Sequence, residues 1–233
     1  SISITQQSDG SILLANVDKL YSLHDKESQF TQLKDFEPIL KEGDVIQDLY
    51  INKSTLFIQT SSSLYLYSNL NQKLKELVYL NSKDGQGASQ NIRSILVAND
   101  VLWLATQQGL FSLSVDKIES YLADIGPVPL FSQELNGLGV WKIVPQKKVL
   151  YLATSKGLFS FDPNNNTTEL LWTFNKSKYQ LADSIINDLF SDDNGNLWAV
   201  SVAEGVYFWR PSTQKFTNVF RQDNEIPQLS NNI

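Results

Sequence analysis

The chain has 233 residues, which is long enough to bury a large core within one domain. Its formal net charge is −6 without a run of like charge, so the composition gives no footprint for nucleic acid or for an anionic membrane surface. It contains no cysteine, which excludes disulfides and thiol chemistry, and no apolar run long enough for direct membrane insertion by this segment.

A short apolar sequence, Leu-Trp-Leu-Ala-Thr at 102–106, recurs in similar form along the chain and predicts its architecture. We call it the apolar phrase. The phrase recurs about every 46 residues and starts at Ile12, Leu56, Leu102, Leu150 and Leu197. Repeats of about 40 to 50 residues with strand-like content are typical of propellers. We therefore predict an all-β fold, a β-propeller segment of about five four-stranded antiparallel blades.

The elements of each period follow one order, strands A to D. Strand A begins near Ile2, Val45, Ile92, Val140, Ile185 and Ile233. This phase predicts a single propeller domain with blades at 1–43, 44–90, 91–138, 139–184 and 185–231, and a sixth blade opening at 232–233. Such a segment is either cut from a longer array or a five-bladed ring closed without shared strands.

The third period shows the order most clearly. Strands A, B and C are expected at 91–97, 102–106 and 110–113, and a weaker strand D at 118–122. A glycine precedes strand C in three periods, where a tight turn calls for a positive φ: Gly109, Gly157 and Gly205. An aromatic residue recurs in strand B and is expected to pack between neighbouring sheets rather than to bind a ligand: Phe57, Trp103, Tyr151 and Trp198.

Motifs of catalysis and metal binding are weak. Residues 191–198 fit an Asp-box, S-x-D-x-G-x-x-W, which we interpret as a hairpin staple because it lies between two strands. A sialidase would need a converging arginine cluster, and the chain has only Arg93, Arg210 and Arg221. His24 is the sole histidine, and Asp192 to Asn194 lack the ligand spacing of an EF-hand. We predict no catalytic residue, no cofactor and no metal.

Loop lengths point to one end of the blades as the binding face. The connections from strand D to the next strand A are the longest, and alternation of the strands places them at the same end as the B-to-C turns. Loops on a rigid scaffold commonly carry recognition. We predict a small polar or sugar-like ligand there, with ordinary solvated loops as the alternative. The expected ligand-binding residues are Gln107, Gln108, Phe131, Lys156, Tyr179 and Glu204.

The fifth period resembles the two-component regulator propeller repeat. The resemblance is carried by residues 185–198, the segment 204–207 and Phe216, and residues 229–233 look like the opening of another copy. It implies a periplasmic or extracellular sensor segment of a bacterial inner-membrane receptor, either a hybrid histidine kinase or a membrane-bound diguanylate cyclase. The segment itself would be non-catalytic and could signal through pairing in a homodimeric receptor.

Two other function classes stay open. One is a protein-interaction scaffold of the WD-repeat sort, which predicts an apolar rim without a small-molecule pocket. The other is a propeller glycan hydrolase or lyase, which predicts carboxylates or histidines that converge on the central funnel.

Overall fold

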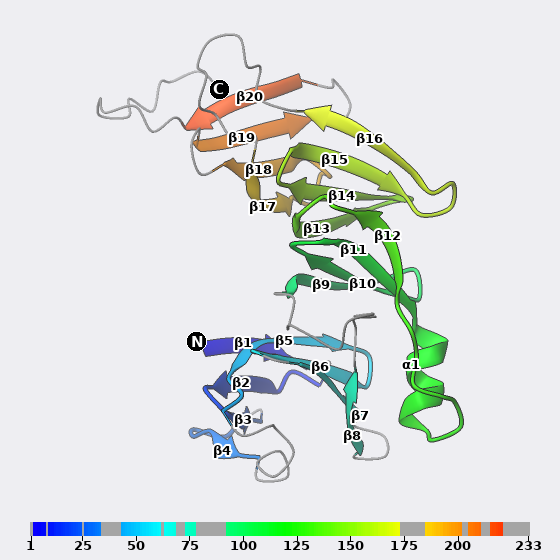
Figure 1. Cartoon of the computed structure of the whole chain (residues 1–233). Coiled ribbons are helices and arrows are strands. Elements are labelled where there is room, and N and C mark those ends of the chain that lie inside the picture. The colour runs from blue at the N-terminus through cyan, green and yellow to red at the C-terminus, as the bar shows by residue number, and fades with distance from the viewer. Residues whose placement is uncertain are drawn as a thin grey trace. The chain divides into compact units, whose positions relative to one another are not determined.

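The computed structural model describes residues 2–7, 9–24, 26–33, 43–61, 63–68, 73–77, 92–172, 185–201, 205–210 and 215–220. These residues form five four-stranded antiparallel sheets, which confirms the predicted all-β propeller segment (Figure 1). In each sheet the strands pair in chain order, as the strands of a propeller blade do. The predicted opening of a sixth blade at 232–233 lies outside the described residues.

The strands of the first two sheets are short and regular. The first sheet contains β1 (Ile2–Gln6), β2 (Ile12–Asn16), β3 (Lys19–Leu23) and β4 (Thr31–Gln32). The second contains β5 (Ile46–Asn52), β6 (Thr55–Thr60), β7 (Leu64–Ser68) and β8 (Lys73–Leu77).

The remaining sheets follow the same order. The third contains β9 (Ile92–Ala98), β10 (Val101–Thr106), β11 (Gly109–Ser114) and β12 (Ser132–Asn136). The fourth contains β13 (Val140–Gln146), β14 (Val149–Thr154), β15 (Gly157–Asp162) and β16 (Thr167–Trp172). The fifth contains β17 (Ile186–Ser191), β18 (Leu197–Ser201), β19 (Gly205–Arg210) and β20 (Lys215–Phe220).

The chain divides into two compact units. The first comprises Ser1–Ile92, Val97–Trp103 and Ser112–Ser132, and the second comprises Arg93–Leu96, Leu104–Phe111 and Gln133–Ile233. Each unit has its own apolar core between neighbouring sheets. In the first unit β2 and β3 pack on β5 to β7, and in the second unit β14 and β15 pack on β17 to β19.

The aromatic residues of strand B are buried or half-buried, and Tyr151 belongs to the core between the fourth and fifth sheets, as predicted. Phe57, Trp103 and Tyr151 are buried, and Trp198 is half-buried. The Tyr151 ring meets the Trp209 ring of the next sheet edge-on, with 5.3 Å between the ring centroids. An edge-to-face pair of this kind adds about 1 kcal/mol beyond the area that it buries.

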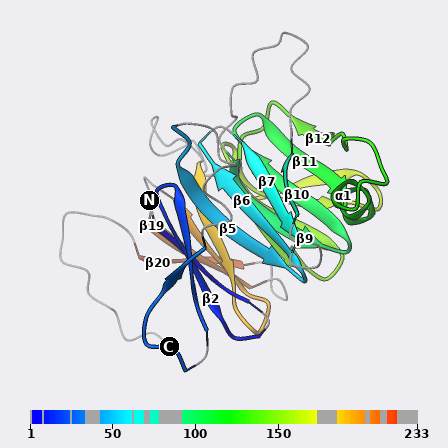
Figure 2. The ribbon, with the colours of Figure 1, turned by 90° about the horizontal axis from the view of Figure 1, so that it is seen from below.

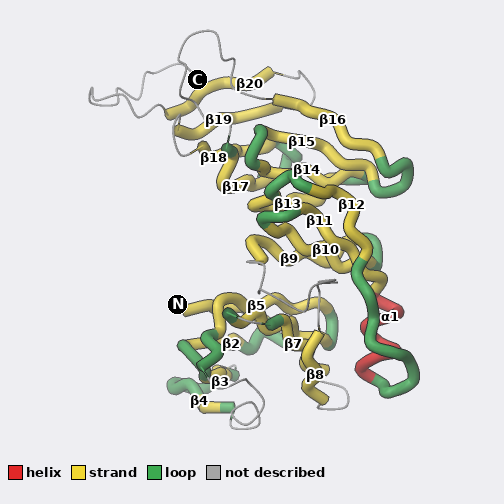
Figure 3. The backbone as a smooth tube through the Cα atoms, in the orientation of Figure 1, coloured by secondary structure: helices red, strands yellow, loops and turns green. Residues whose placement is uncertain are grey.

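The predicted strand D at 118–122 is wrong. This segment is part of helix α1 (Val115–Leu122), the only helix in the described part of the chain (Figure 3), and β12 completes the sheet instead. The physical reason is the spacing of the apolar residues. Val115, Ile118 and Leu122 are all buried, and intervals of three and four residues place them on one face of a helix.

Helix α1 is anchored on β8, and Figure 2 shows the helix nearly end-on. The Tyr121 hydroxyl donates to the carbonyl of Glu76 over 3.1 Å, and the Lys75 ammonium lies 4.4 Å from the centre of the Tyr121 ring. Lys73 and Lys75 both donate to the Asp124 carboxylate just beyond the helix. These two lysines lower the pKa of Asp124 to about 2.

The glycines before strand C adopt positive φ values, as predicted. The angles are 150° at Gly109, 123° at Gly157 and 91° at Gly205. At Gly109 space is also critical, because a Cβ atom would lie 1.6 Å from the carbonyl oxygen of Leu135 on β12. The close pairing of β11 with β12 therefore requires glycine at this position.

We predict that Gly109→Ala lowers the free energy of unfolding by about 3 kcal/mol, since the backbone of β12 must move. Gly137→Ala is the matched control, because Gly137 also has a positive φ, 71°, but open space around its Cβ position. The control should cost only about 1 kcal/mol. Denaturant titration of both variants measures the difference, and equal losses would contradict the steric account.

Candidate functional site

The first residues of strand A carry an irregularity that recurs between sheets. In β5, β13 and β17 the pairing with strand B jumps from the first residue to the third. The second residue, respectively Gln47, Trp141 or Asn187, is therefore the extra residue of a β-bulge. Arg93 is the second residue of β9. A bulge redirects a side chain away from the regular face of its sheet.

Three of these second residues surround one cavity in the second unit. The cavity has a volume of about 380 Å³ and is lined by Arg93 of β9, Trp141 of β13, Asn187 of β17 and the preceding Ile185. The Arg93 guanidinium lies over the Trp141 ring, 5.4 Å from its centre. Three successive blades therefore each contribute a polar or aromatic side chain to the same space.

Two of the described lining residues offer hydrogen-bond donors. Trp141 Nε1 also has no hydrogen-bond partner among the described residues, but this atom is buried and not exposed to the cavity. The guanidinium of Arg93 has five N–H donors and no acceptor, and the Asn187 amide can both donate and accept. No carboxylate side chain is among the lining residues that the structure describes. Such a lining suits a ligand that carries acceptor oxygens.

The B-to-C turns approach this cavity through Gly139. A Cβ atom at Gly139 would lie 3.3 Å from the tip of the Trp141 ring, 3.2 Å from the Gln107 carbonyl oxygen and 3.5 Å from Ser155 Oγ. The backbone N–H of Gly137 donates to Gln108 over 2.9 Å, and that of Ser155 donates to Gly139 over 2.9 Å. The turns of two sheets therefore meet the connection into β13.

A buried hydroxyl holds each of these turns in place. Thr106 and Thr154 are both 0% exposed, and each hydroxyl donates to the carbonyl of the glycine that opens strand C, over 3.0 and 2.7 Å. The same oxygens accept the backbone N–H groups of Gln108 and Lys156. The threonine that ends the apolar phrase therefore stabilises the B-to-C turn on which the predicted ligand-binding residues lie.

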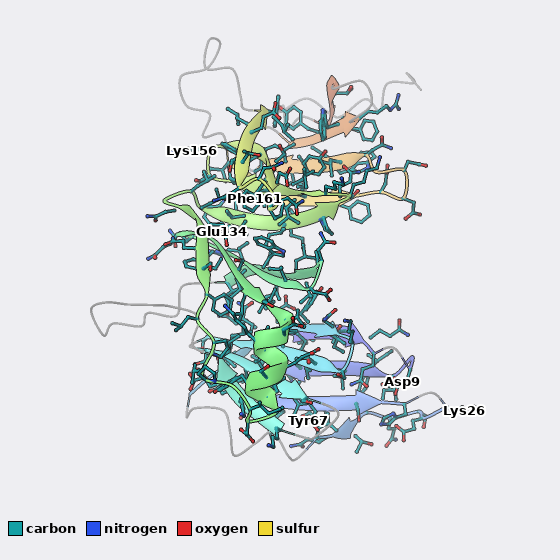
Figure 4. All side chains as sticks on the ribbon, turned by 90° about the vertical axis from the view of Figure 1, so that its right-hand side faces the viewer. Asp9, Lys26, Tyr67, Glu134, Lys156 and Phe161 are labelled. Carbon is teal, nitrogen blue, oxygen red and sulfur yellow. The ribbon has the colours of Figure 1, made fainter. Side chains whose placement is uncertain are left out.

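The structure describes four of the six predicted ligand-binding residues. Gln107, Gln108 and Lys156 are exposed at the B-to-C turns of the second unit, and Figure 4 labels Lys156 at the turn between β14 and β15. Phe131 is half-buried in the first unit, directly before β12. Tyr179 and Glu204 lie outside the described residues. The assignment of all six to a ligand stays a prediction.

Sequence reasoning missed Arg93, Trp141 and Asn187. A signal for them exists in the spacing of strand A, where buried apolar residues are three apart instead of two: Ile46 and Leu49, Val140 and Ile143, Ile186 and Leu189. An interval of three in a half-buried strand indicates an inserted residue.

The residues of the Asp-box stabilise the turn between β17 and β18. The Asp192 carboxylate accepts the backbone N–H groups of Asn194 and Asn196 over 3.0 and 2.9 Å, and it also accepts the side chain of Asn196. The hydrogen bond from the Asn196 side chain is the main reason why the pKa of Asp192 lies below its usual value. The neighbouring cavity of about 950 Å³ is lined by the A-to-B turns of the last two sheets.

Groups of three or more potential metal-binding side chains are absent among the described residues. Nor does the described part of the chain contain a helix long and apolar enough to cross a membrane.

The chain is similar in fold to extracellular segments of bacterial proteins. It superimposes with a TM-score of 0.64 on the extracellular domain assigned to the hybrid two-component system BT3049 of B. thetaiotaomicron, at 19% identity, covering 93% of this chain and 29% of that one. The extracellular domain assigned to the one-component system BT4673 of the same organism gives 0.59, at 17% identity and with 99% and 34% covered.

PorZ of Porphyromonas gingivalis, a surface component of the type-IX secretion system, gives a TM-score of 0.66 at 12% identity, with 94% of this chain and 28% of that chain covered. This chain therefore spans about a third of the length of these structures. No family model matches the chain, and no curated protein matches it significantly. At these identities the likeness establishes the fold.

We predict that Asn196→Ala raises the pKa of Asp192 toward its usual value, which a carboxyl-detected NMR titration measures. A lowered folded-state pKa stabilises the hairpin above the unfolded-state value, about 3.9, and this contribution disappears as the pH falls through the folded-state pKa. The variant should therefore be less stable than the parent at pH 6, and the difference should shrink toward pH 2.

Asn164→Ala is the control for this titration, because Asn164 belongs to the corresponding Asx turn around Asp162 in another hairpin. It should leave the pKa of Asp192 unchanged. An unchanged pKa of Asp192 in the Asn196→Ala variant would contradict the role of the Asn196 side chain in this turn.

Proposed function

We propose that the chain is a non-catalytic, ligand-sensing propeller segment on the extracytoplasmic side of a bacterial signal-transduction receptor. The observation that carries the proposal is the cavity to which three successive blades each contribute the second residue of strand A: Arg93, Trp141 and Asn187. Ligand pockets commonly have volumes of about 300 to 1,000 Å³ and a few polar groups that fix the ligand. The cavity of about 380 Å³ falls in this range.

The fold comparisons support the location and the role. The structures assigned to BT3049 and BT4673 are extracellular domains of two-component or one-component systems, and they are similar in fold to this chain. In such a receptor a ligand alters the output only if it binds one receptor state more tightly than the other. The ligand contacts residues from different blades, so its binding energy can depend on how those blades are arranged.

A second function, a protein-interaction scaffold, is favoured by one surface. Helix α1 and the loop after it line a cavity of about 640 Å³, and three apolar side chains beside it are strongly exposed. Ile125 is 85% exposed, Leu130 64% and Val128 52%. Exposed apolar patches of this kind often mark protein contacts.

The two functions are separated with the full-length polypeptide in the bacterium that encodes it. Transcripts that change when this gene is deleted define the output. Trp141→Ala should reduce the change in these transcripts at least tenfold, and so resemble the gene deletion, because the cavity loses its largest side chain. The double variant Ile125→Asp, Leu130→Asp should keep the output, and immunoblots confirm equal abundance of all variants.

The opposite pattern, with output lost in the double variant and kept in Trp141→Ala, would favour the scaffold. A deletion that changes no transcript would refute the sensor role.

A further inference from the structure

The cavity at Arg93, Trp141 and Asn187 has a chemistry that limits the ligands it can take. We propose that it binds a small organic carboxylate, with the carboxylate on Arg93 and the ligand's ring or carbon skeleton against Trp141 and Ile185. This inference rests on the proposed sensor function and specifies the class of ligand.

Arg93 provides the charge. Its side chain is exposed to the cavity space and lies over the indole of Trp141, an arrangement that holds the guanidinium through its face. A guanidinium carries its five N–H donors in one plane. A carboxylate offers two acceptor oxygens with the spacing that a guanidinium matches in a bidentate pair.

Among the described residues, the carboxylate beside Asn187 is engaged elsewhere. None of the salt bridges among the described residues involves Arg93. Asp188, the neighbour of Asn187, accepts the backbone N–H of Leu189 over 2.8 Å and lies 4.0 Å from the Lys142 ammonium. Its charge is therefore partly balanced by Lys142.

One further group suits the same ligand. Asn187 can donate to a hydroxyl or carboxylate oxygen across the cavity. Ile185 and the indole supply the apolar wall that a ring or carbon skeleton requires.

The carboxylate could belong to a sugar or to an aromatic acid, and two matched pairs of probes distinguish these sources. D-glucuronate is compared with D-glucose, and benzoate with benzyl alcohol, by NMR titration of the tryptophan indole N–H signals of the 233-residue chain. At least one carboxylate should bind at least tenfold more tightly than its neutral partner. The pair that shows this difference identifies the source.

Variants locate the binding. Arg93→Gln should weaken carboxylate binding by about tenfold to a hundredfold, as expected for the loss of a charge-assisted hydrogen bond. Trp141→Phe keeps an aromatic ring but offers a smaller apolar wall, and it should weaken binding by a smaller factor. Arg210→Gln is the matched control, because Arg210 lies over the Phe208 ring in a similar way, 5.6 Å from its centre, but does not line the cavity.

Each outcome is decisive. Carboxylate binding that Arg93→Gln removes and Arg210→Gln preserves supports the inference. Neutral probes that bind through Trp141 as tightly as the carboxylates would overturn the carboxylate class while leaving the sensor function intact. Carboxylate binding that survives Arg93→Gln, or failure of all four probes to bind, would also overturn it, and the transcript test of the sensor function stands apart from these results.

Discussion

The coverage of both faces of strands β6, β10 and β14 is the constraint on which the rest of the structure depends. Side chains alternate across a strand, so a strand that is buried along its whole length needs a neighbour on each face. In β14 the residues Leu150 to Ala153 are all at most 9% exposed, and Tyr151 and Ala153 face the fifth sheet. The apolar phrase is buried almost throughout in β6, β10 and β14 because each of these strands must satisfy this requirement, whereas β2 and β18 keep alternate residues partly exposed.

This constraint confines recognition to the ends of the strands. Strand B cannot present a side chain to a ligand without opening a core. The B-to-C turns can, because Thr106 and Thr154 fix their backbone internally and leave Gln107, Gln108 and Lys156 exposed. The bulge in strand A offers a second place for recognition. In β13 the extra residue, Trp141, is free to face a ligand while Val140 and Ile143 stay buried on either side of it.

The fold could be predicted from the sequence because the period and the strand order are repeated five times. Helix α1 was missed, since the repeat led to an expected strand where the apolar spacing of Val115, Ile118 and Leu122 is helical. The cavity was missed for a related reason. Trp141 and Asn187 differ in type, and only the register of the sheets shows that they occupy equivalent positions. The turn residues could be found because turns follow directly from strand boundaries.

The central claim is that the bulge in strand A serves recognition and is dispensable for the scaffold. Deletion of Trp141 tests it, because the pairing of β13 with β14 then becomes regular: Val140 stays opposite Thr154 and Lys142 opposite Ala153. Denaturant titration should show one cooperative transition and a loss of no more than about 2 kcal/mol. Deletion of Ile143, which is 3% exposed, should cost about 4 kcal/mol or prevent folding. If the Trp141 deletion is as damaging as the Ile143 deletion, the bulge is part of the scaffold and the account is wrong.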